Sequence, residues 1–545
     1  MKLFKYGLPF AALALLASCA NDKLDGPTDN QVHTGSAYLN ISIAMPRGIE
    51  GRAVDYTQDG DNNEYAVDDC KLYLFDTSGS CAAVLDLTND FSKEGTPNDI
   101  TSKATNVKVS LPEGFNTDAT YNGLIIINTA ALSSVPQIGT SWATWSVAPQ
   151  TSFSNGDGTS KHFAMTNALG WAGDVTAAAP SSVLVEITAN DFYYESETNS
   201  NPAKAFYVQR VAAKVSLTST ALAFDKYKAV YGTNEADKVK LENWWLNVVN
   251  ENGYPVQTLG TWANNLITDW TAIASTSNTS HLDRFVSNAV STPTFKRINW
   301  CEDYNYSGTG AKPTQYNIAP TNVSNNLSTN LYCFENTFDV TNMTKEQSTT
   351  AYFKATYIPN DEDDEIVEVD GTTLSGEAPS FIMYNKVIYV ITDNTKLLAE
   401  TSKTAALNTL LKETELASAQ EKLNVSASTV VDFYYKGECY YTAIIRHFGN
   451  DETAVDEDWK RTTDTYAADE EYGAETTYGT DANFLGRYGV VRNNWYELSL
   501  NKISGPGKPT PPTPGTDIDD DEDPKVLDAT VNILSWAKRT QDVEW

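Results

Sequence analysis

The sequence predicts an all-β protein with at least two domains and one further strand near the C-terminal end. Its 545 residues exceed the usual size of a single domain. The 29 tyrosines and 12 tryptophans, together with many threonines and valines, favour strands over helices. Segments in which apolar and polar residues alternate recur along the chain, and this period of two is typical of half-buried strands.

The last of these strands is expected within 526–545, beyond a Pro/Asp-rich linker at 505–525. Its apolar residues are Leu527, Ala529, Val531, Ile533, Leu534 and Trp536. The first four share one face, whereas the last two lie on the other, which predicts a bulge or strong twist after Ile533. The linker has too little apolar content to fold by itself, so we expect it to be extended and solvated. Such a strand needs an open sheet edge on which to dock.

The N-terminal segment predicts export. Residues 1–18 have the lysines, apolar run and small-residue end of a signal peptide, and the sequence up to Cys19 resembles a bacterial lipobox. That resemblance implies lipid acylation of Cys19 after cleavage. The alternative is an ordinary signal peptide with an incidental cysteine. No later run reaches the roughly 20 apolar residues needed to span a bilayer.

A first strand is expected over 37–45, with Leu39, Ile41, Ile43 and Met45 on one face. A polar connection with arginines at Arg47 and Arg52 follows, and either arginine could be cut by an arginine-specific protease. The Arg52–Ala53 bond is the preferred site. The alternative is a loop that merely contains an arginine.

The first and last strands have matching apolar patterns, so one could replace the other. If cleavage removed residues 37–45, the first sheet would lose an edge strand and expose backbone donors, acceptors and core. The tail of another copy could then add as a strand. Four buried apolar side chains and about eight hydrogen bonds would contribute roughly 10–20 kcal/mol before costs. Because such head-to-tail contacts do not close, they build a filament.

Several motifs resemble the Bacteroidales fimbrillins of type V pili, in particular the major subunit of Mfa-type short fimbriae. Besides the lipobox, the Arg52–Ala53 site and the terminal strand, these are Gln209-Arg-Val-Ala-Ala-Lys-Val215, Tyr352-Phe-Lys-Ala-Thr-Tyr-Ile-Pro359, Tyr434-Tyr-Lys-Gly-Glu-Cys-Tyr-Tyr441 and Val490-Val-Arg-Asn-Asn-Trp-Tyr-Glu-Leu498. The glutamine at 209 replaces the acid usual in that family. Most of 53–205 matches only as pattern.

The resemblance implies two transthyretin-like β-sandwich domains with a C-terminal donor-strand extension. The expected division is 1–18 signal peptide, 19–52 lipidated propeptide with the removable first strand, 53–208 N-terminal domain, 209–504 C-terminal domain, 505–525 linker and 526–545 donor strand. It further implies an outer-membrane lipoprotein precursor that becomes a fimbrial shaft subunit. Its partners would be other copies, anchor and tip subunits, the protease, and host or bacterial surface ligands in adhesion and biofilm formation.

Between the two terminal strands, the pattern predicts a series of strands and few helices. They are expected at 70–76, 81–87, 106–111, 122–128, 182–189, 205–217, 242–250, 350–358, 381–392, 429–436, 439–446 and 490–502. Short helical structure is expected near 140–146, and a longer helix within 401–423 that covers a sheet face. The strand at 205–217 is expected to carry the chain from the first domain into the second.

The cysteines favour buried thiols. The hairpin at 70–87 turns at Ser78-Gly79 and leaves Cys70 too far from Cys81 for a disulfide. Bridges among Cys301, Cys333 and Cys439 stay open.

No catalytic, metal or cofactor motif is present in the sequence, and an enzyme is not expected. The acidic segments 59–64 and 361–365 could offer oxygen ligands to Ca²⁺, but solvated loops are the favoured interpretation. Arg210 and Lys214 share a face, where we expect them to reach solvent or pair across the sheet. Trp244, Trp245 and the aromatic residues of 434–441 could bind a glycan, although core packing is the commoner use.

Two functions therefore remain open. The formal charge of −32 disfavours nucleic acid and anionic membranes as partners. The first function is a structural filament subunit. The alternative is a monomeric surface lipoprotein that binds glycan or protein ligands and keeps its lipid and its first strand.

Overall fold

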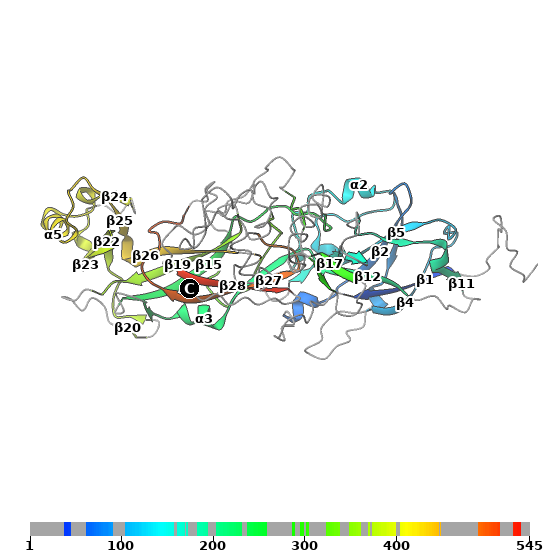
Figure 1. The fold of residues 1–545 in the computed structure, drawn as a ribbon, viewed down its shortest axis with the longest axis horizontal. Helices are drawn as coiled ribbons and strands as arrows, with labels where there is room; N and C mark the ends of the chain where they lie inside the picture. The colour runs from blue at the N-terminus through cyan, green and yellow to red at the C-terminus, as the bar shows by residue number, and fades with distance from the viewer. Residues whose placement is uncertain are drawn as a thin grey trace, which may run out of the picture.

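The computed structural model is mostly β, with its sheets arranged along an elongated molecule (Figure 1). The structure describes residues 37–44, 61–90, 104–156, 161–168, 170–172, 182–194, 203–230, 237–258, 286–288, 295–298, 301–304, 323–337, 348–360, 369–370, 373–398, 404–445, 447, 489–512 and 527–535.

Nine strands form the sheet nearer the N-terminus. They are β1 (Ala37–Ala44), β2 (Cys70–Phe75), β3 (Cys81–Asp86), β4 (Ala104–Ser110), β5 (Tyr121–Ile127), β8 (Met165–Asn167), β10 (Val185–Ile187), β11 (Phe192–Tyr194) and β12 (Lys204–Arg210). The main strand order is β11-β1-β12-β8-β5-β2-β3, with β4 paired to β1 and β10 to β5. Apolar residues of β1, β4 and β12 share one buried core with those of β2, β3 and β5.

Two four-stranded sheets follow and pack across a second core. One has the order β18-β13-β27-β28 and the other β14-β15-β19-β26. Their bounds are β13 (Ala213–Leu217), β18 (Leu331–Cys333), β27 (Asn494–Ile503), β28 (Leu527–Ser535), β14 (Lys228–Ala229), β15 (Lys238–Asn247), β19 (Thr350–Ile358) and β26 (Glu438–Ile444). Trp244 and Tyr441 are buried here and Trp245 packs on Tyr352, which confirms core packing for these aromatic residues.

A smaller sheet lies at the end of the molecule opposite β1 (Figure 1). Its strands, in the order β23-β22-β25-β24, are β22 (Ser380–Tyr384), β23 (Val387–Ile391), β24 (Thr404–Ala406) and β25 (Val430–Tyr434). Helix α5 (Glu413–Leu423) buries Ala419 and Leu423 against it. The expected helix over 401–423 is therefore correct only in its second half.

The remaining elements are short. They are α2 (Trp142–Trp145), α3 (Ser219–Leu222), β6 (Ser154–Asn155), β7 (His162–Phe163), β9 (Gly170–Ala172), β16 (Val286–Asn288), β17 (Phe295–Ile298), β20 (Val369–Asp370) and β21 (Thr373–Leu374). Helix α2 confirms the short helix expected near 140–146. The hairpin of β2 and β3 turns through Gly79 at φ +80°, as expected. Phe75 pairs with Cys81 and Cys70 with Ile127, and the five described cysteines are buried and form no disulfide with one another.

Two expected single strands are each divided. Residues 381–392 form the β22–β23 hairpin, because Asn385 and Lys386 both adopt positive φ and close a two-residue turn. Residues 205–217 form β12 and β13, which belong to different sheets. Between them the amide of Val211 donates to the carbonyl of Ala164, next to β8 of the first sheet, and the chain then enters β13 of the following sheet.

Candidate strand-exchange site

Strand β1 lies inside the first sheet, with neighbours on both sides. On one side it pairs antiparallel with β4, where Leu39 faces Val109 and Ile41 faces Val107. On the other side its first part pairs antiparallel with β11 and its second part parallel with β12, with Ile43 opposite Phe206. The expectation of an edge strand is therefore wrong. The partners that enclose β1 come from distant parts of the sequence.

The inner face of β1 is part of the core. Leu39, Ile41 and Ile43 are fully buried among residues of β4, β11 and β12. At about 1.5–3 kcal/mol each, these three side chains contribute roughly 5–9 kcal/mol. Removing β1 would open a slot between β4 on one side and β11 and β12 on the other. Apolar core residues would be exposed at the base of this slot, and the backbone groups of the bordering strands would be unpaired. Met45, the fourth predicted residue of this face, lies outside the described residues.

The outer face of β1 carries an aromatic contact that the sequence analysis did not find. The ring of Tyr38 stacks on that of Tyr193 in β11, with centroids 5.7 Å apart. On the other side, Nζ of Lys108 in β4 lies 3.5 Å from the centroid of the Tyr38 ring. Tyr38 therefore bridges the two strands that β1 separates, through stacking and a cation–π contact.

Strand β28 lies at the edge of its sheet and pairs antiparallel with β27, from Leu527 opposite Ile503 to Ser535 opposite Asn494. In the intact chain the tail thus docks on the strand that precedes its own linker. The register irregularity falls in β27 between Leu500 and Lys502. The bulge expected after Ile533 is therefore misplaced. Within this pairing β28 has one strand neighbour, whereas β1 has neighbours on both sides.

Beyond the expected Arg52–Ala53 cleavage site, the described chain resumes at Asp61, next to a buried ion cluster. A 3-10 helix at Asn62–Tyr65 places the carboxylate of Glu64 2.7 Å from Nζ of Lys214, and both side chains are about 1% exposed or less. Nε of Arg210 donates to the Glu64 carbonyl at 2.7 Å, and the Tyr332 hydroxyl donates to its carboxylate. Burial raises the pKa of Tyr332, so its hydroxyl stays a donor.

This cluster corrects one expectation and decides between the two alternatives of another. Glu64 is not part of a solvated loop. For Arg210 and Lys214, pairing is correct and solvent exposure is not: both are at most 3% exposed and both bond Glu64. Buried charges persist only with partners, and Glu64 supplies one to Lys214. Since Arg210 ends β12 and Lys214 lies in β13, the contacts of Glu64 attach residues 61–65 to both sheets.

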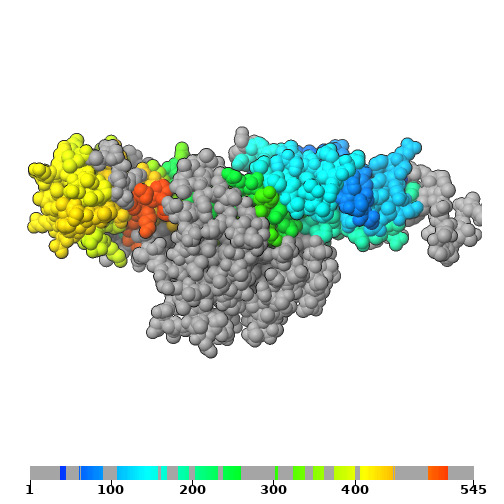
Figure 2. Space-filling model, turned by 90° about the horizontal axis from the view of Figure 1, so that it is seen from above, coloured from blue at the N-terminus to red at the C-terminus, as the bar shows by residue number. Residues whose placement is uncertain are grey.

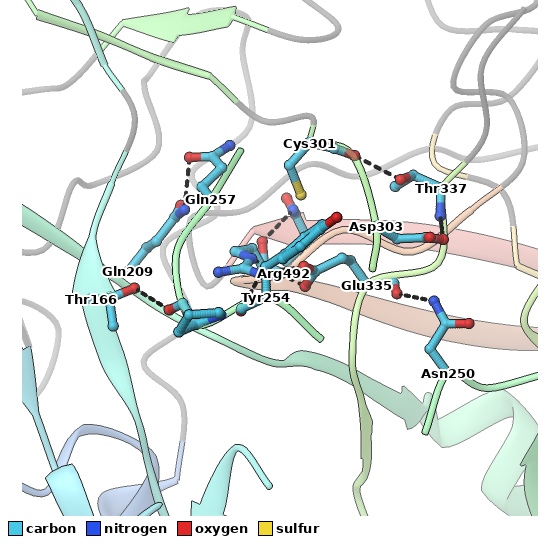
Figure 3. A network of polar contacts seen from close by, with 12 residues as sticks. Thr166, Gln209, Asn250, Tyr254, Gln257, Cys301, Asp303, Glu335, Thr337 and Arg492 are labelled. Carbon is cyan, nitrogen blue, oxygen red and sulfur yellow. Dashed lines mark hydrogen bonds and ion pairs between the residues drawn. The ribbon is translucent and has the colours of Figure 1, made fainter. Parts of the chain in front are cut away.

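A second buried network joins loops of the two halves (Figure 3). Arg492, which precedes β27, donates from Nε to Glu335 at 3.0 Å and from Nη2 to the carbonyl of Tyr254 at 2.8 Å. Gln209 of β12 donates to Gln257 at 2.8 Å. These contacts hold β12 and the start of β27 against the same loop, 250–257.

The structure describes some of the predicted site residues and not others. Cys19, Arg52, Ala53 and Trp536 lie outside the described residues, as does the acidic segment 361–365. The donor residues from Leu527 to Leu534 are in β28. Across the described part of the chain, no group of three or more acidic, histidine or cysteine side chains is placed to hold a metal ion. The described helices include none long and apolar enough to cross a bilayer.

Comparison with known proteins identifies the C-terminal segment. Residues 470–542 match the family model described as "Major fimbrial subunit protein type IV, Fimbrillin, C-terminal". The matched segment contains β27, the linker and β28. A search of curated proteins gave no match.

Solved structures of Bacteroidales proteins are also similar to this chain. One is a candidate cell adhesion protein of Parabacteroides distasonis, with 9% identity, TM-score 0.34 and coverage of 92% of this chain and 99% of the other. Another, from Bacteroides eggerthii, has 11% identity, TM-score 0.32 and coverage of 91% and 96%. A fimbrial assembly protein of P. distasonis has 11% identity, TM-score 0.28 and coverage of 61% and 85%. Residues 470–542 are therefore similar to the C-terminal segment of fimbrillins.

Proposed function

We propose that this protein is the shaft subunit of a cell-surface fimbria, built from two transthyretin-like β-sandwich domains divided near residue 208. It is exported as a lipoprotein acylated at Cys19 and trimmed at Arg52–Ala53. The tail strand of each copy then fills the slot that β1 leaves in the next, so the subunits form a head-to-tail polymer. Its other partners are the anchor and tip subunits, the arginine-specific protease and the surface ligands to which the fimbria adheres.

The observation that carries the proposal is the position of β1. It is a buried strand with neighbours on both sides, and Arg52 lies eight residues beyond its end at Ala44. Glu64, twelve residues after Arg52, is held by its buried ion pair with Lys214. Cleavage would free β1 as a separate peptide while the rest of the first sheet stays attached at the ion cluster.

The exchange has a physical driving force. In the intact chain β28 has β27 as its strand neighbour, at a sheet edge. In the slot it would pair with β4 on one side and with β11 and β12 on the other, and its apolar face would replace that of β1. The gain is a second set of backbone hydrogen bonds, at roughly 0.5–1.5 kcal/mol each, and the apolar face of the tail covers the core that β1 leaves exposed. Cleavage is therefore the step that makes polymerisation favourable.

The proposal predicts that a core substitution in β1 affects the precursor and not the polymer. Ile41→Ala should destabilise the uncleaved subunit by about 2–5 kcal/mol, because Ile41 is fully buried. Denaturant unfolding of the precursor measures this loss. Polymers assembled after cleavage should dissociate at the wild-type denaturant concentration, because the substituted strand is gone.

The matched control is Ile125→Ala in β5, a buried residue of the same core that cleavage does not remove. It should weaken precursor and polymer alike. If Ile41→Ala also weakens the polymer, β1 is retained after assembly and the proposed function fails.

A further inference from the structure

The first part of the expected linker packs against the second domain. Residues 505–512, here called the strap, are separated from the end of β27 by Ser504 alone. Gly505, Pro506, Gly507 and Pro509 are buried, whereas Lys508 is exposed. The expectation of a solvated tether from residue 505 is therefore wrong for these residues. Residues 489–512 form the orange surface beside the yellow end of the molecule (Figure 2).

Backbone pairing joins the strap to the edge of β26. The amide of Tyr440 donates to the carbonyl of Lys508 at 2.8 Å, and the amide of Lys508 donates back to the carbonyl of Tyr440 at 2.8 Å. Gly507 permits this approach, because a Cβ atom at that position would lie 2.2 Å from the Tyr440 carbonyl oxygen. The strap therefore covers an edge of β26 that would otherwise expose backbone groups.

Three tyrosine hydroxyls hold strap carbonyls. Tyr441 donates to Gly505 at 2.9 Å, Tyr434 to Gly507 at 2.8 Å and Tyr352 to Pro512 at 3.1 Å. Burial raises the pKa of Tyr434 and of Tyr441 above the ordinary value of 10, so both hydroxyls remain protonated donors at physiological pH. These bonds come from β19, β25 and β26. None of them depends on β28, so the strap can stay in place when β28 leaves β27.

We propose that the strap is a fixed exit point for the tail, and that Tyr434, Tyr441 and Gly507 are positioning residues for strand exchange. This inference rests on the proposed function. With the strap bound, residues 513–526 connect it to β28 and can span at most about 50 Å. If the strap were released, the connection would be 505–526, with a maximum span of about 75 Å. The strap thereby limits the distances and directions at which a second copy can accept the tail, and so sets a uniform spacing of subunits.

The test uses the full chain carrying Tyr434→Phe and Tyr441→Phe, which keep both rings and remove the two donors. Filaments are assembled after arginine-specific cleavage, and subunit spacing and bending are measured by electron microscopy. The double variant should give a spread of spacings at least twice that of the wild type, and more flexible filaments. Tyr389→Phe is the matched control, because its hydroxyl bonds Glu415 away from the strap, and it should leave the spacing unchanged.

Shortening the connection separates positioning from simple stabilisation. Deleting eight residues from 513–525 in the double variant restores the original free length, and should narrow the spacing again without restoring the lost hydrogen bonds. Double-variant filaments with wild-type spacing would overturn the inference. Polymerisation that persists after removal of 524–545 would instead refute the proposed function, so the two failures are distinguishable.

A measurement on the wild type covers the case in which the double variant does not fold. The Lys508 amide, bonded to Tyr440, should exchange its hydrogen equally slowly in the cleaved monomer and in the filament, because the strap stays bound. Exchange that becomes at least tenfold faster on assembly would contradict a fixed exit point.

Discussion

A subunit lacking residues 524–545 is expected to fold, to be cleaved and to remain monomeric. Strand β28 is an edge strand beyond β27, so its removal leaves the order β18-β13-β27 and the facing sheet in place. The cleaved protein would still have an open slot but no donor to fill it. Size-exclusion chromatography and electron microscopy of the cleaved protein measure the outcome, which is loss of all filaments.

The matched control for this deletion is a tail with Thr530→Ser, which keeps the apolar residues from Leu527 to Ile533 and should polymerise normally. Val531→Asp should behave like the deletion, because it would place a charge in an apolar slot at a cost of several kcal/mol. Normal filaments from either the deleted or the Val531→Asp subunit would refute the role of the tail as donor.

The second large effect is expected at the cleavage site. Arg52→Ala should leave a folded precursor that keeps β1 in its sheet and does not polymerise, because the slot stays filled by Leu39, Ile41 and Ile43. Arg47→Ala should be cleaved and should assemble as the wild type does. Denaturing gel electrophoresis without heating distinguishes the resistant ladder of a polymer from the single band of a precursor.

The two arginine variants also decide between the candidate bonds. If Arg47→Ala blocks assembly and Arg52→Ala does not, the cut is at Arg47 and the rest of the account stands. Polymers formed from a subunit with both substitutions would show that removal of β1 is not required, and strand exchange in this form would be wrong.

The positions of the terminal strands β1 and β28 were predictable because the alternation of apolar and polar residues lies within each strand itself. Alternation at 37–45 places Leu39, Ile41 and Ile43 on one face, and the structure buries that face completely. The same periodicity locates β28, whose described extent is Leu527–Ser535. A period of two depends only on the geometry of the strand itself, so it survives whatever the neighbours are.

The neighbours of each strand were not predictable, because pairing is decided by residues distant in sequence. β1 lies between β4 and β12, so it is internal rather than at an edge. Similarly, Glu64 is buried because Lys214 pairs with its carboxylate and Arg210 bonds its carbonyl. The acidic composition of its own segment predicts only a solvated loop. The sequence near Glu64 contains no pattern that predicts these distant partners.

The strap, residues 505–512, likewise shows that amino-acid composition does not predict whether a segment packs on a distant surface. A run of glycine and proline indicates that a segment cannot build its own core, but it does not exclude packing on another surface. The buried tyrosines Tyr434 and Tyr441 provide donors for its carbonyls. Gly507, which composition assigns to a flexible linker, is required by close approach to β26.

The central claim is tested most directly by identifying which residues are present in native filaments, using mass spectrometry of material purified without added protease. The account predicts protomers that begin at Ala53 and contain the tail through Trp536, with no peptide from 37–45. Recovery of acylated Cys19 or of residues 37–45 in stoichiometric amount from assembled filaments would contradict it.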